Sequence, residues 1–597
     1  MSTNNVYYVD MEQRFSDYLA GKINMRNLHE MVYDHGNVAL ALRQLSKSSG
    51  RMTKGPDGTN FKTLEPYSIV ELSEIVRERL MAKKMDYVRR VYIPKGNKKS
   101  GKMRPLGICT IWDKLVEKCI QLVIEPYCET KFVESSFGFR EQASAHNALA
   151  KVKLQCQTMP YVLAVDMKDY FGTIDPDIAY RELWHIGIRD QVILNYLYRF
   201  IKKGYFEDSC KVEDPRGTPQ GSILGPLISN VYLHRFDVWL RDQGDCWHDQ
   251  SVAKFHNAIN RRRNLEKTAL KIGIHVRYAD DILVLCKSRD DAMRFRYSVT
   301  KYLTKNMKLE INEEKTRVFD LTHERMKYLG YDFYVEKTHV KGLAGKFMVT
   351  NVLPKEKEDA IVERCRELLV CMKNAPTLEN LHNWNVYVVG IHNYYRGMNK
   401  FCTSFHKIGW RISRLFYHTM EARAKRIEEQ SYKDNYLEGR YRAWGKVGYY
   451  CFDRCPVIDI RWASWDRELI HATKCRVSRK NPYAYGEKKH KPGVSMNDIS
   501  YLVNTSKHIK NSRLALFRVS KYSSVKGVSY LSGNYVPVWN YHCHHIIPKE
   551  KNGTDDFDNL CVLSSEEHRI LHGNEPEQLI KLYPKKYKRI MKLINSL

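Results

Sequence analysis

The chain has 597 residues, which suggests about four domains at ~150 residues each. Hydrophobic residues make up 43% and charged residues 28%, which excludes a mostly disordered, collagen-like or coiled-coil chain. The 98 Lys and Arg residues exceed the 68 Asp and Glu residues, so the formal net charge is +30. A surplus this large predicts a polyanionic partner and favours nucleic acid.

The 15 cysteines are scattered and contain no Cys-x-x-Cys pair, which excludes a secreted disulfide framework. Most are expected to be small buried hydrophobes, although Cys451, Cys455 and Cys475 leave a thiolate metal site open. The N-terminus lacks the apolar core of a signal peptide, and no apolar run approaches the ~18 residues that span a bilayer. We therefore expect an intracellular protein with reduced thiols and no membrane partner.

The first half of the chain alternates between helical and strand patterns. Residues 60–84 and 111–124 carry apolar side chains near the helical period, so both segments are predicted to be helices. Residues 87–93 alternate like a strand. A short apolar run over residues 161–165 predicts a buried strand, and two apolar arms over residues 276–285 predict a hairpin.

The second half is predicted to be largely helical and to contain one linker. Residues 355–373 form an amphipathic pattern, and the aromatic stretch 381–400 is expected to be helical. Pro, Gly and basic side chains over residues 476–493 make this segment the best linker candidate. A small His-rich unit follows it.

Three carboxylates fall at predicted strand ends. Asp166 ends the apolar run, and Asp280 and Asp281 form the tip of the hairpin 114 residues later. Nucleotidyl transfer uses two divalent ions ~3.5–4 Å apart, and carboxylates on adjacent strands are the hard oxygen ligands that Mg²⁺ prefers. By itself, Tyr278-Ala279-Asp280-Asp281 could equally be a plain hairpin turn.

Seven ordered blocks place this motif in a wider context. The chain resembles the reverse transcriptases over about residues 85–335. The blocks, in chain order, are Val91-Tyr92-Ile93-Pro94-Lys95 with Arg104-Pro105-Leu106-Gly107-Ile108, Phe137-Gly138-Phe139-Arg140, Val165-Asp166-Met167-Lys168-Asp169-Tyr170-Phe171, Gly217-Thr218-Pro219-Gln220-Gly221, Tyr278-Ala279-Asp280-Asp281, Leu309-Glu310-Ile311-Asn312-Glu313-Glu314-Lys315-Thr316 and Tyr328-Leu329-Gly330-Tyr331.

This resemblance implies roles for several side chains. The three carboxylates would hold two Mg²⁺ ions, and Lys95 and Arg104 would grip the incoming triphosphate. Phe171 would stand where a ribonucleotide 2′-hydroxyl would have to go, and Gln220 would contact the nucleotide or the template. The alternatives are a core aromatic for Phe171 and solvated cations for Lys95 and Arg104.

Within this class the chain is most similar to the group II intron-encoded proteins. The Arg-Pro-Leu-Gly-Ile block, Ser136-Phe137-Gly138-Phe139-Arg140 and the Gly-Thr-Pro-Gln-Gly run have that family's forms. The stretch around Tyr394-Tyr395-Arg396-Gly397 looks like its thumb, or maturase, region. Glu141 stands where that family usually has Pro, and Gly225 where Ser is common; neither departure touches the proposed metal ligands.

The C-terminal segment 542–572 contains a second constellation. It holds the pair His544-His545, a turn at Gly553, then Asn559, and then His568 and His572. Two His residues four apart on a helix face one direction and can bind one cation.

This pattern resembles the HNH (ββα-metal) nucleases over about the last 60 residues. The resemblance implies that His544, His568 and His572 bind one divalent metal, Mg²⁺ or similar, that His545 activates water, and that Asn559 orients His545. A structural zinc knuckle without cleavage is the alternative.

Many HNH domains also carry two Cys-x-x-Cys pairs that bind a structural zinc. Here Ser564 and Glu567 occupy the positions of one pair, and Cys543 and Cys561 are expected to be packed thiols. The core must therefore come from apolar residues, for which we expect Val536, Val538, Trp539, Ile546, Ile547, Leu560, Val562, Leu563, Ile570 and Leu571.

Together these features predict a multidomain α+β chain. We expect a right-hand polymerase, with fingers, a palm built on an antiparallel sheet and an α-helical thumb, followed by a small ββα-metal nuclease. The expected boundaries are 1–345 for fingers and palm, 346–440 for the thumb, 441–505 for a basic DNA-binding region and linker, and 506–597 for the nuclease.

The combination resembles a mobile group II intron protein. It implies a chain that helps its intron RNA splice, nicks target DNA and extends the nick into cDNA on the RNA, so its partners would be intron RNA, target DNA and deoxynucleoside triphosphates. The basic runs Arg261-Arg262-Arg263 and Lys488-Lys489-His490-Lys491 are candidate contacts. The implied location is the bacterial cytoplasm, with the nucleoid when bound to DNA, and a homodimer stays open.

Two other functions remain open from the sequence alone. One is an RNA-binding splicing factor without catalysis, which the intact Asp280-Asp281 and His544-His545 pairs argue against. The other is a reverse transcriptase and nuclease that serves a host function.

Overall fold

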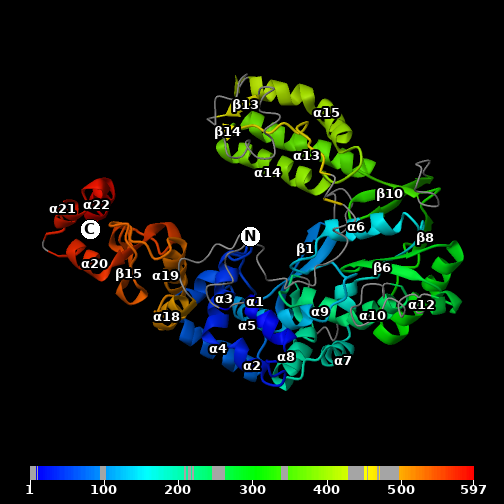
Figure 1. Cartoon of the computed structure of the whole chain (residues 1–597), viewed down its shortest axis with the longest axis horizontal. Helices are drawn as coiled ribbons and strands as arrows, with labels where there is room; N and C mark the ends of the chain where they lie inside the picture. The colour runs from blue at the N-terminus through cyan, green and yellow to red at the C-terminus, as the bar shows by residue number, and fades with distance from the viewer. Residues whose placement is uncertain are drawn as a thin grey trace.

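The computed structural model describes residues 9, 11–94, 103–207, 210–212, 217, 221–244, 263–337, 347–421, 423–427, 449–452, 455–466, 469–470, 496–573 and 575–596. In the view of Figure 1, N-terminal helices lie at the bottom centre, a four-stranded sheet with its helices at the right, a helical unit at the top and the C-terminal module at the left. No helix in the described part of the chain combines the length and the hydrophobicity needed to cross a bilayer.

The N-terminal part is a helical cluster. Its members are α1 (Met11–Leu19), α2 (Leu28–Val32), α3 (His35–Ser46), the 3₁₀ turn η1 (Phe61–Leu64), α4 (Ile69–Met81) and α5 (Ile111–Glu129). The single helix predicted over residues 60–84 is wrong in its first part. Pro66 disfavours helical geometry at the residue before it, and Ser68 then starts α4 through a capping box with Glu71.

A small sheet follows the helical cluster, in the segment predicted to hold the fingers. Its strands are β1 (Val88–Pro94), β2 (Met103–Ile108), β4 (Tyr205–Glu207) and β5 (Cys210–Val212), in the order β2-β1-β4-β5. The predicted strand over residues 87–93 is confirmed as β1. It pairs antiparallel with β2, so that Ile93 lies opposite Arg104.

The largest antiparallel sheet among the described residues lies in the segment predicted to hold the palm, and we call it the palm sheet. Its strands are β3 (Tyr161–Val165), β6 (Gly273–Tyr278), β7 (Asp281–Cys286) and β8 (Arg317–Asp320), in the order β6-β7-β3-β8. The predicted strand 161–165 and hairpin 276–285 are therefore confirmed. The surrounding helices are α6 (Ala145–Gln155), α7 (Pro176–Ile186), α8 (Gln191–Ile201), α9 (Gly225–Tyr232), α10 (His234–Asp242) and α12 (Arg289–Met307).

Both faces of the palm sheet are buried. Leu163 and Val165 pack into the same core as α12, whereas Val162 packs into the core that contains α6. Because successive strand residues point to opposite faces, helices on both faces explain why β3 is a continuous apolar run rather than an alternating one.

A third sheet and three helices lie around the segment predicted to be the thumb, and we call them the thumb region. The strands are β9 (Met326–Tyr328), β10 (Tyr331–Lys337) and β11 (Phe347–Val352), and the helices are α13 (Lys355–Asn374), α14 (Leu378–Tyr395) and α15 (Phe401–Glu421). The predicted helix 355–373 is confirmed. The helix predicted over 381–400 ends at Tyr395. At Gly397 a Cβ would lie 2.8 Å from Ile470 Cγ1, so the backbone there is closely packed.

Residues beyond α15 pack back onto the thumb helices. Strands β12 (Lys425–Ile427), β13 (Tyr449–Phe452) and β14 (Cys455–Pro456) form a small sheet. The fully buried Trp384 donates its indole N–H to the Ile458 carbonyl at 2.9 Å. This part of the segment expected to be linker therefore belongs to the thumb core, and residues 476–493 lie outside the described residues.

The C-terminal module begins with two helices and continues as a strand–strand–helix unit. Its elements are α18 (Met496–Ser506), α19 (Ser512–Ser524), η7 (Val538–Asn540), β15 (Tyr541–His545), η8 (Lys549–Lys551), η9 (Phe557–Asn559), β16 (Leu560–Ser564), α20 (Ser565–Leu571), α21 (Gln578–Leu582), η10 (Pro584–Lys586) and α22 (Tyr587–Ile594). Strands β15 and β16 pair antiparallel and place His544 opposite Cys561.

The core expected for this module is mostly confirmed. Ile570 is partly buried, and the buried members are Val536, Val538, Ile546, Leu560, Val562, Leu563 and Leu571. The prediction is wrong for Trp539, which is 74% exposed in η7, and for Ile547, which is 45% exposed on the loop after β15. Neither residue lies on a strand, and both face solvent, Trp539 from a 3₁₀ turn and Ile547 from a loop.

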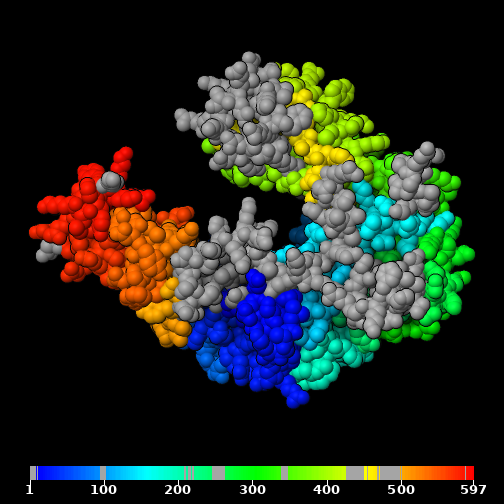
Figure 2. Space-filling view, in the orientation of Figure 1, coloured from blue at the N-terminus to red at the C-terminus, as the bar shows by residue number. Residues whose placement is uncertain are grey.

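The C-terminal module docks on the N-terminal helices. Arg43 donates to the Ser520 hydroxyl at 2.6 Å, and the Ser512 hydroxyl donates to the Leu64 carbonyl at 3.0 Å. Ala515 and Leu516 of α19 join the large core of the N-terminal half. Figure 2 shows the orange and red module against the blue N-terminal surface. The module is therefore held by a packed interface as well as by the chain that leads to it.

Candidate polymerase and nuclease sites

The palm sheet brings the three predicted carboxylates to one edge. Asp166 follows the last residue of β3, and Val165 lies opposite Ile282 of β7. Asp281 begins β7 directly after Asp280, so all three side chains lie at adjoining strand ends. Asp280 and Asp281 are exposed and Asp166 is half-buried, which leaves their oxygens accessible to cations and substrate.

A buried ionic network fixes the hairpin tip. Arg277, on β6 just before the tip, is fully buried and donates to the Ala279 carbonyl at 3.0 Å. The same guanidinium donates to both oxygens of Asp237 on α10, at 2.6 and 2.8 Å, and to Asn230 Oδ1 at 3.1 Å. These contacts hold Ala279 in the left-handed conformation, with φ at +57°.

The Phe137–Arg140 block packs directly behind this tip. The amide of Asn230 donates to the Gly138 carbonyl at 2.9 Å. A Cβ on Gly138 would collide with the Ala279 main chain, so only glycine fits there. The sequence interpretation assigned no role to Asn230, Asp237 or Arg277. The one available signal was an arginine inside an otherwise apolar strand.

The segment 309–316 wraps around Asp166. Its main chain donates from Asn312 to the Asp166 carbonyl at 2.8 Å, and the Asp166 amide donates to Thr316 Oγ1 at 3.1 Å. Lys315 places its ammonium 3.4 Å from an Asp166 carboxylate oxygen, and both groups are exposed enough to meet a ligand. Lys315 was quoted in the sequence blocks without a role, and the fold places it at the site.

Phe171 lies five residues after Asp166, in the 3₁₀ turn η3 (Tyr170–Thr173). It is half-buried and meets Phe139 edge-on, with ring centroids 6.2 Å apart. The next residue, Gly172, lies against Gly217: a Cβ on Gly217 would be 2.7 Å from the Gly172 carbonyl oxygen. The turn that carries Phe171 and the start of the Gly217–Gly221 run are therefore neighbours.

The structure tests the predicted nucleotide-binding set only in part. Arg104 lies exposed on β2, opposite Ile93. Lys95 and Gln220 lie outside the described residues. Their roles stay predictions, as does the grip of Arg104 on a triphosphate.

Replacing Phe171 with valine is expected to raise ribonucleotide incorporation relative to deoxynucleotide incorporation. A rigid ring beside the nucleotide sugar would exclude a 2′-hydroxyl by steric overlap, and valine would open room for it. If the ring is mainly a core residue, truncation to alanine instead costs ~3–5 kcal/mol of stability and lowers all activity. The measurement is the ratio of ribo- to deoxynucleotide incorporation efficiencies, with a melting curve for each protein.

Tyr170→Phe is the matched control, because Tyr170 is the buried neighbour whose hydroxyl donates to the Ser229 carbonyl at 2.7 Å. It should leave the ratio unchanged. An unchanged ratio for Phe171→Val together with a lowered melting temperature would refute a role in sugar selection.

The C-terminal module gathers three histidines. His544 on β15 and His568 and His572 at α20 have ring nitrogens that all lie within 4.8 Å of one another, and no other such triad occurs among the described residues. His544 Nε2 lies 2.9 Å from His572 Nε2. His544 Nδ1 is buried and has no hydrogen-bond partner within the described chain. The donor set fits a divalent cation.

Burial favours the neutral, metal-binding form of two of these histidines. Burial and then the neighbouring histidines lower the pKa of His544 to about 4, and burial lowers the pKa of His568 as well. Both imidazoles are therefore neutral at neutral pH, which is the form that ligates metals.

His545, the predicted base, contacts Asp555. Its Nε2 lies 2.8 Å from Asp555 Oδ1, and Lys549 lies 2.7 Å from the other oxygen. Burial raises the pKa of Asp555, but the hydrogen bonds from Lys549 and His545 outweigh it and bring that pKa below its usual range. Because an ionised carboxylate only accepts, the neutral form of the His545 ring carries its proton on Nε2 and presents the lone pair of Nδ1.

Asn559 holds the loop rather than the imidazole. Its amide donates to the carbonyls of Ile547 and Thr554 at 2.9 Å, and its Oδ1 accepts from the Ile547 amide at 2.8 Å. Among the described residues, the side chain that contacts His545 is that of Asp555, which the sequence interpretation missed. The signal was the Asp555-Asp556 pair in the loop between the two strands.

A buried carboxylate, that of Glu567, lies at one of the two positions compared above with a Cys-x-x-Cys pair. Glu567 is 2% exposed and forms a capping box with Ser564 at the start of α20. It also accepts from the Ser529 hydroxyl at 2.7 Å and from the Ser532 amide at 3.1 Å. Hydrogen bonds thus join the 529–532 turn to α20. Cys561 is buried, and burial raises the pKa of its thiol to about 12, as expected for a packed thiol.

Glu567→Ala is expected to destabilise the C-terminal module by about 3 kcal/mol, because the Ser529 hydroxyl and the Ser532 and Ser564 amides would lose their acceptor. Glu567→Gln should cost less, since the amide oxygen can still accept. Thermal unfolding of the full chain, followed by hydrogen exchange over residues 512–572, measures the effect. Glu566→Ala, at the exposed neighbouring position, is the control. Equal protection from hydrogen exchange in the Glu567→Ala and Glu566→Ala variants would contradict a stabilising role for Glu567.

The cysteine metal site that the sequence leaves open falls only partly within the described residues. Cys451 and Cys455 lie on the neighbouring strands β13 and β14, while Cys475 lies outside the described residues. The thiolate site therefore stays a hypothesis.

Comparison with known proteins agrees with the palm geometry. The family described as reverse transcriptase (RNA-dependent DNA polymerase) matches residues 93–333. The match includes Asp166, Phe171, Asp280 and Asp281 and ends well before the C-terminal module. It gives the chain a right-hand polymerase fold, which agrees with the mixed helices and sheets of the structure.

Three relatives share this region. Protein YkfC of Escherichia coli K12 is 28% identical over 369 residues, which is 58% of this chain and 93% of that protein. The group II intron-encoded protein LtrA of Lactococcus lactis is 32% identical over 297 residues, which is 43% of this chain and 49% of LtrA. The COX1/OXI3 intron 1 protein of Saccharomyces cerevisiae is 26% identical over 355 residues, 55% of this chain and 42% of that protein.

The chain spans about half the length of these intron-encoded relatives. The family match and the palm carboxylates point to the same assignment. Residues 93–333 therefore form a reverse transcriptase domain, which is similar to those of the group II intron-encoded proteins.

Proposed function

We propose that this chain is the RNA-directed DNA polymerase of a mobile group II intron and that its C-terminal module nicks the DNA target. The observation that carries the proposal is that one basic chain holds two groups of side chains suited to bind metal ions. These are the palm carboxylates and the histidine triad of the strand–strand–helix unit. The formal net charge of +30 suits a protein that must hold RNA and DNA together.

In the palm, Asp166, Asp280 and Asp281 are the side chains that would hold two Mg²⁺ ions. Bound there, the ions supply charge that favours ionisation of the primer 3′-hydroxyl and stabilises the departing pyrophosphate. Arg104 and Lys95 add fixed positive charge toward the triphosphate, and Lys315 adds an ammonium beside Asp166. Phe171 limits the space around the nucleotide sugar.

In the C-terminal module, His544, His568 and His572 would hold one divalent ion, Mg²⁺ or similar. That ion supplies charge that polarises the scissile phosphate. His545 then takes the proton of the attacking water on Nδ1, while Asp555 keeps Nε2 protonated and orients the ring. Asn559 fixes the loop that carries Asp555 through its bonds to the main chain.

The intron association rests on the relatives and on charge. LtrA is named as a group II intron-encoded protein, and we infer a comparable RNA partner here. The chain would bind its intron RNA, assist splicing, and extend the nicked DNA with deoxynucleoside triphosphates. A non-catalytic splicing factor would need neither the accessible carboxylates nor the clustered histidine triad, so these features favour the catalytic function.

A splicing and extension assay tests the proposal. The DNA that flanks the reading frame should encode a ribozyme, and its transcript should splice at least about tenfold faster at low Mg²⁺ when the purified protein is added. The same protein should extend a DNA primer on that RNA. Primer extension without any self-splicing RNA around the gene would favour the host-function alternative.

A further inference from the structure

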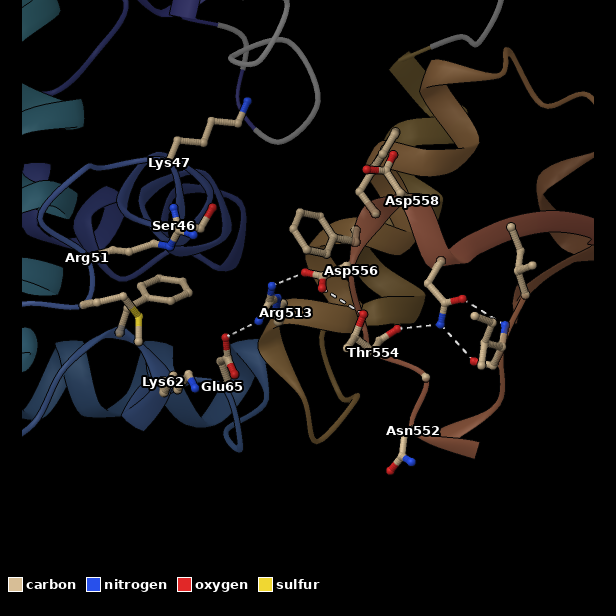
Figure 3. A pocket seen from close by; sticks show the side chains of 18 of the residues that line it. Ser46, Lys47, Arg51, Lys62, Glu65, Arg513, Asn552, Thr554, Asp556 and Asp558 are labelled. Carbon is tan, nitrogen blue, oxygen red and sulfur yellow. Dashed lines mark hydrogen bonds and ion pairs between the residues drawn. The ribbon is translucent and has the colours of Figure 1, made fainter. Parts of the chain in front are cut away.

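A cavity of about 1010 Å³ lies where the C-terminal module docks on the N-terminal helices. One wall is the segment from the end of α3 to η1, and the other is the loop between β15 and β16 (Figure 3). We call this cavity the finger–nuclease pocket. It lies outside the palm site and contains none of the three clustered histidines.

The pocket has surplus positive charge. Lys47, Arg51 and Lys62 project from the N-terminal wall, and Lys592 lies on the opposite wall. All four side chains are exposed, and none makes an ion pair with another described residue. Figure 3 shows Lys47 and Arg51 on one side, facing the nuclease loop across the pocket.

The cations of the pocket outnumber its acidic groups. Glu65, Asp556 and Asp558 are the three carboxylates in its lining. Arg513 pairs with Glu65 at 3.0 Å and also with Asp556, so one guanidinium serves two of them (Figure 3). With Arg513 counted, five cations face three carboxylates, which leaves a formal surplus of two positive charges. This balance favours an anionic ligand.

The pocket shares a loop with the predicted nuclease base. Ile546 and Ile547 follow His545 directly in the chain and line the pocket. Thr554 and Asp556 also line it, and they flank Asp555, which accepts the hydrogen bond from His545. Ile547 is 45% exposed at this wall and offers an apolar surface for a sugar or a base.

We propose that the finger–nuclease pocket binds the sugar-phosphate backbone of the DNA strand that is presented to His545. The cations of the N-terminal wall contact phosphates, and the 546–559 loop contacts the strand from the nuclease side. Phosphate contacts of this kind set the register of a strand on a protein without reading its sequence. The inference rests on the proposed nuclease function and adds to it: the polymerase half of the chain supplies part of the nuclease's substrate site.

The test uses the full chain with Lys47→Gln, Arg51→Gln and Lys62→Gln combined. The matched control is Arg289→Gln, Lys301→Gln and Lys305→Gln on α12, which removes the same charge from another exposed surface. The pocket variant should need at least tenfold more DNA for half-maximal nicking, with an unchanged rate at saturating DNA. Its primer extension should match wild type within about twofold.

Salt dependence gives a second readout that needs no cleavage. DNA binding is measured in a His545→Ala background, and each lost phosphate contact should reduce the log–log salt slope by about 0.9, so the triple variant should lose about 2.7. Lys47→Arg with Lys62→Arg keeps the charge and should behave like wild type. Lys592→Gln, on the other wall, should weaken DNA binding severalfold. This variant replaces the triple variant as the test if the triple variant has a lowered melting temperature.

The outcomes separate this inference from the nuclease assignment. If wild type nicks DNA and the triple variant binds and nicks it as the α12 control does, the pocket proposal is overturned. The same holds if the triple variant loses affinity for single-stranded RNA alone. If no divalent metal supports nicking by wild type, yet DNA affinity and salt slope fall as expected, the nuclease function fails and the pocket stands as a DNA site.

Discussion

Asp280→Ala is expected to reduce primer extension on an RNA template below detection. Carboxylates that hold catalytic metal ions contribute several kcal/mol to stabilising the charge of a transition state, and about 4 kcal/mol corresponds to roughly a thousandfold in rate. Binding of the RNA should be nearly unchanged, because the variant removes an exposed negative charge and no cation. Extension is measured at saturating primer–template and deoxynucleoside triphosphates.

Asp290→Ala is the matched control for this experiment. Asp290 is an exposed carboxylate in the first turn of α12, away from the hairpin tip, so its loss should change extension less than about twofold. The Arg277 network stays intact in both variants, so both should fold with wild-type melting temperatures. Near-normal extension by purified Asp280→Ala protein would refute the polymerase site.

His545→Ala should abolish metal-dependent nicking of target DNA. A general base contributes roughly 10²–10⁴-fold in rate, and here it is held by Asp555 at 2.8 Å. Extension from a supplied primer should stay within about twofold of wild type, because the palm and the module have separate catalytic groups. His508→Ala, at an exposed position before α19, is the control.

A loss of both activities in folded His545→Ala protein would contradict two independent catalytic sites. Asp555→Asn refines the test, because it keeps a hydrogen-bond acceptor near Nε2 but removes the charge that stabilises the protonated imidazole. Its nicking rate should fall between that of wild type and that of His545→Ala. A rate equal to wild type would mean that Asp555 has no part in positioning the base.

Because the C-terminal module docks on the N-terminal helices, one DNA strand could contact both parts of the chain. The C-terminal module contacts the N-terminal helices through Arg43, Ser512, Ser520 and Leu516. These contacts place the loop that follows His545 opposite the N-terminal wall of the pocket. Independent catalysis is compatible with a shared DNA path, because catalysis depends on the side chains at each site and binding depends on the charges along the strand.

The sequence by itself determined the features that have a short period or a short span. The strand 161–165 and the hairpin around Asp280-Asp281 were predicted because short apolar runs are typical of buried strands, and the helix from Lys355 because its apolar residues recur near every 3.6 positions. The pairing of His568 with His572 was predicted for the same reason. In each case the chemistry depends on residues that are neighbours in the chain.

Only the tertiary structure decided the contacts that join distant segments. Arg277 meets Asp237 across 40 residues, Ser529 meets Glu567 across 38, and Arg43 meets Ser520 across 477. A local repeat in the sequence cannot predict such pairs. Each partner taken alone could be exposed or buried, and only the packing of the two segments brings the side chains together. The roles of Asp555 and Glu567 and the finger–nuclease pocket therefore emerged only from the fold.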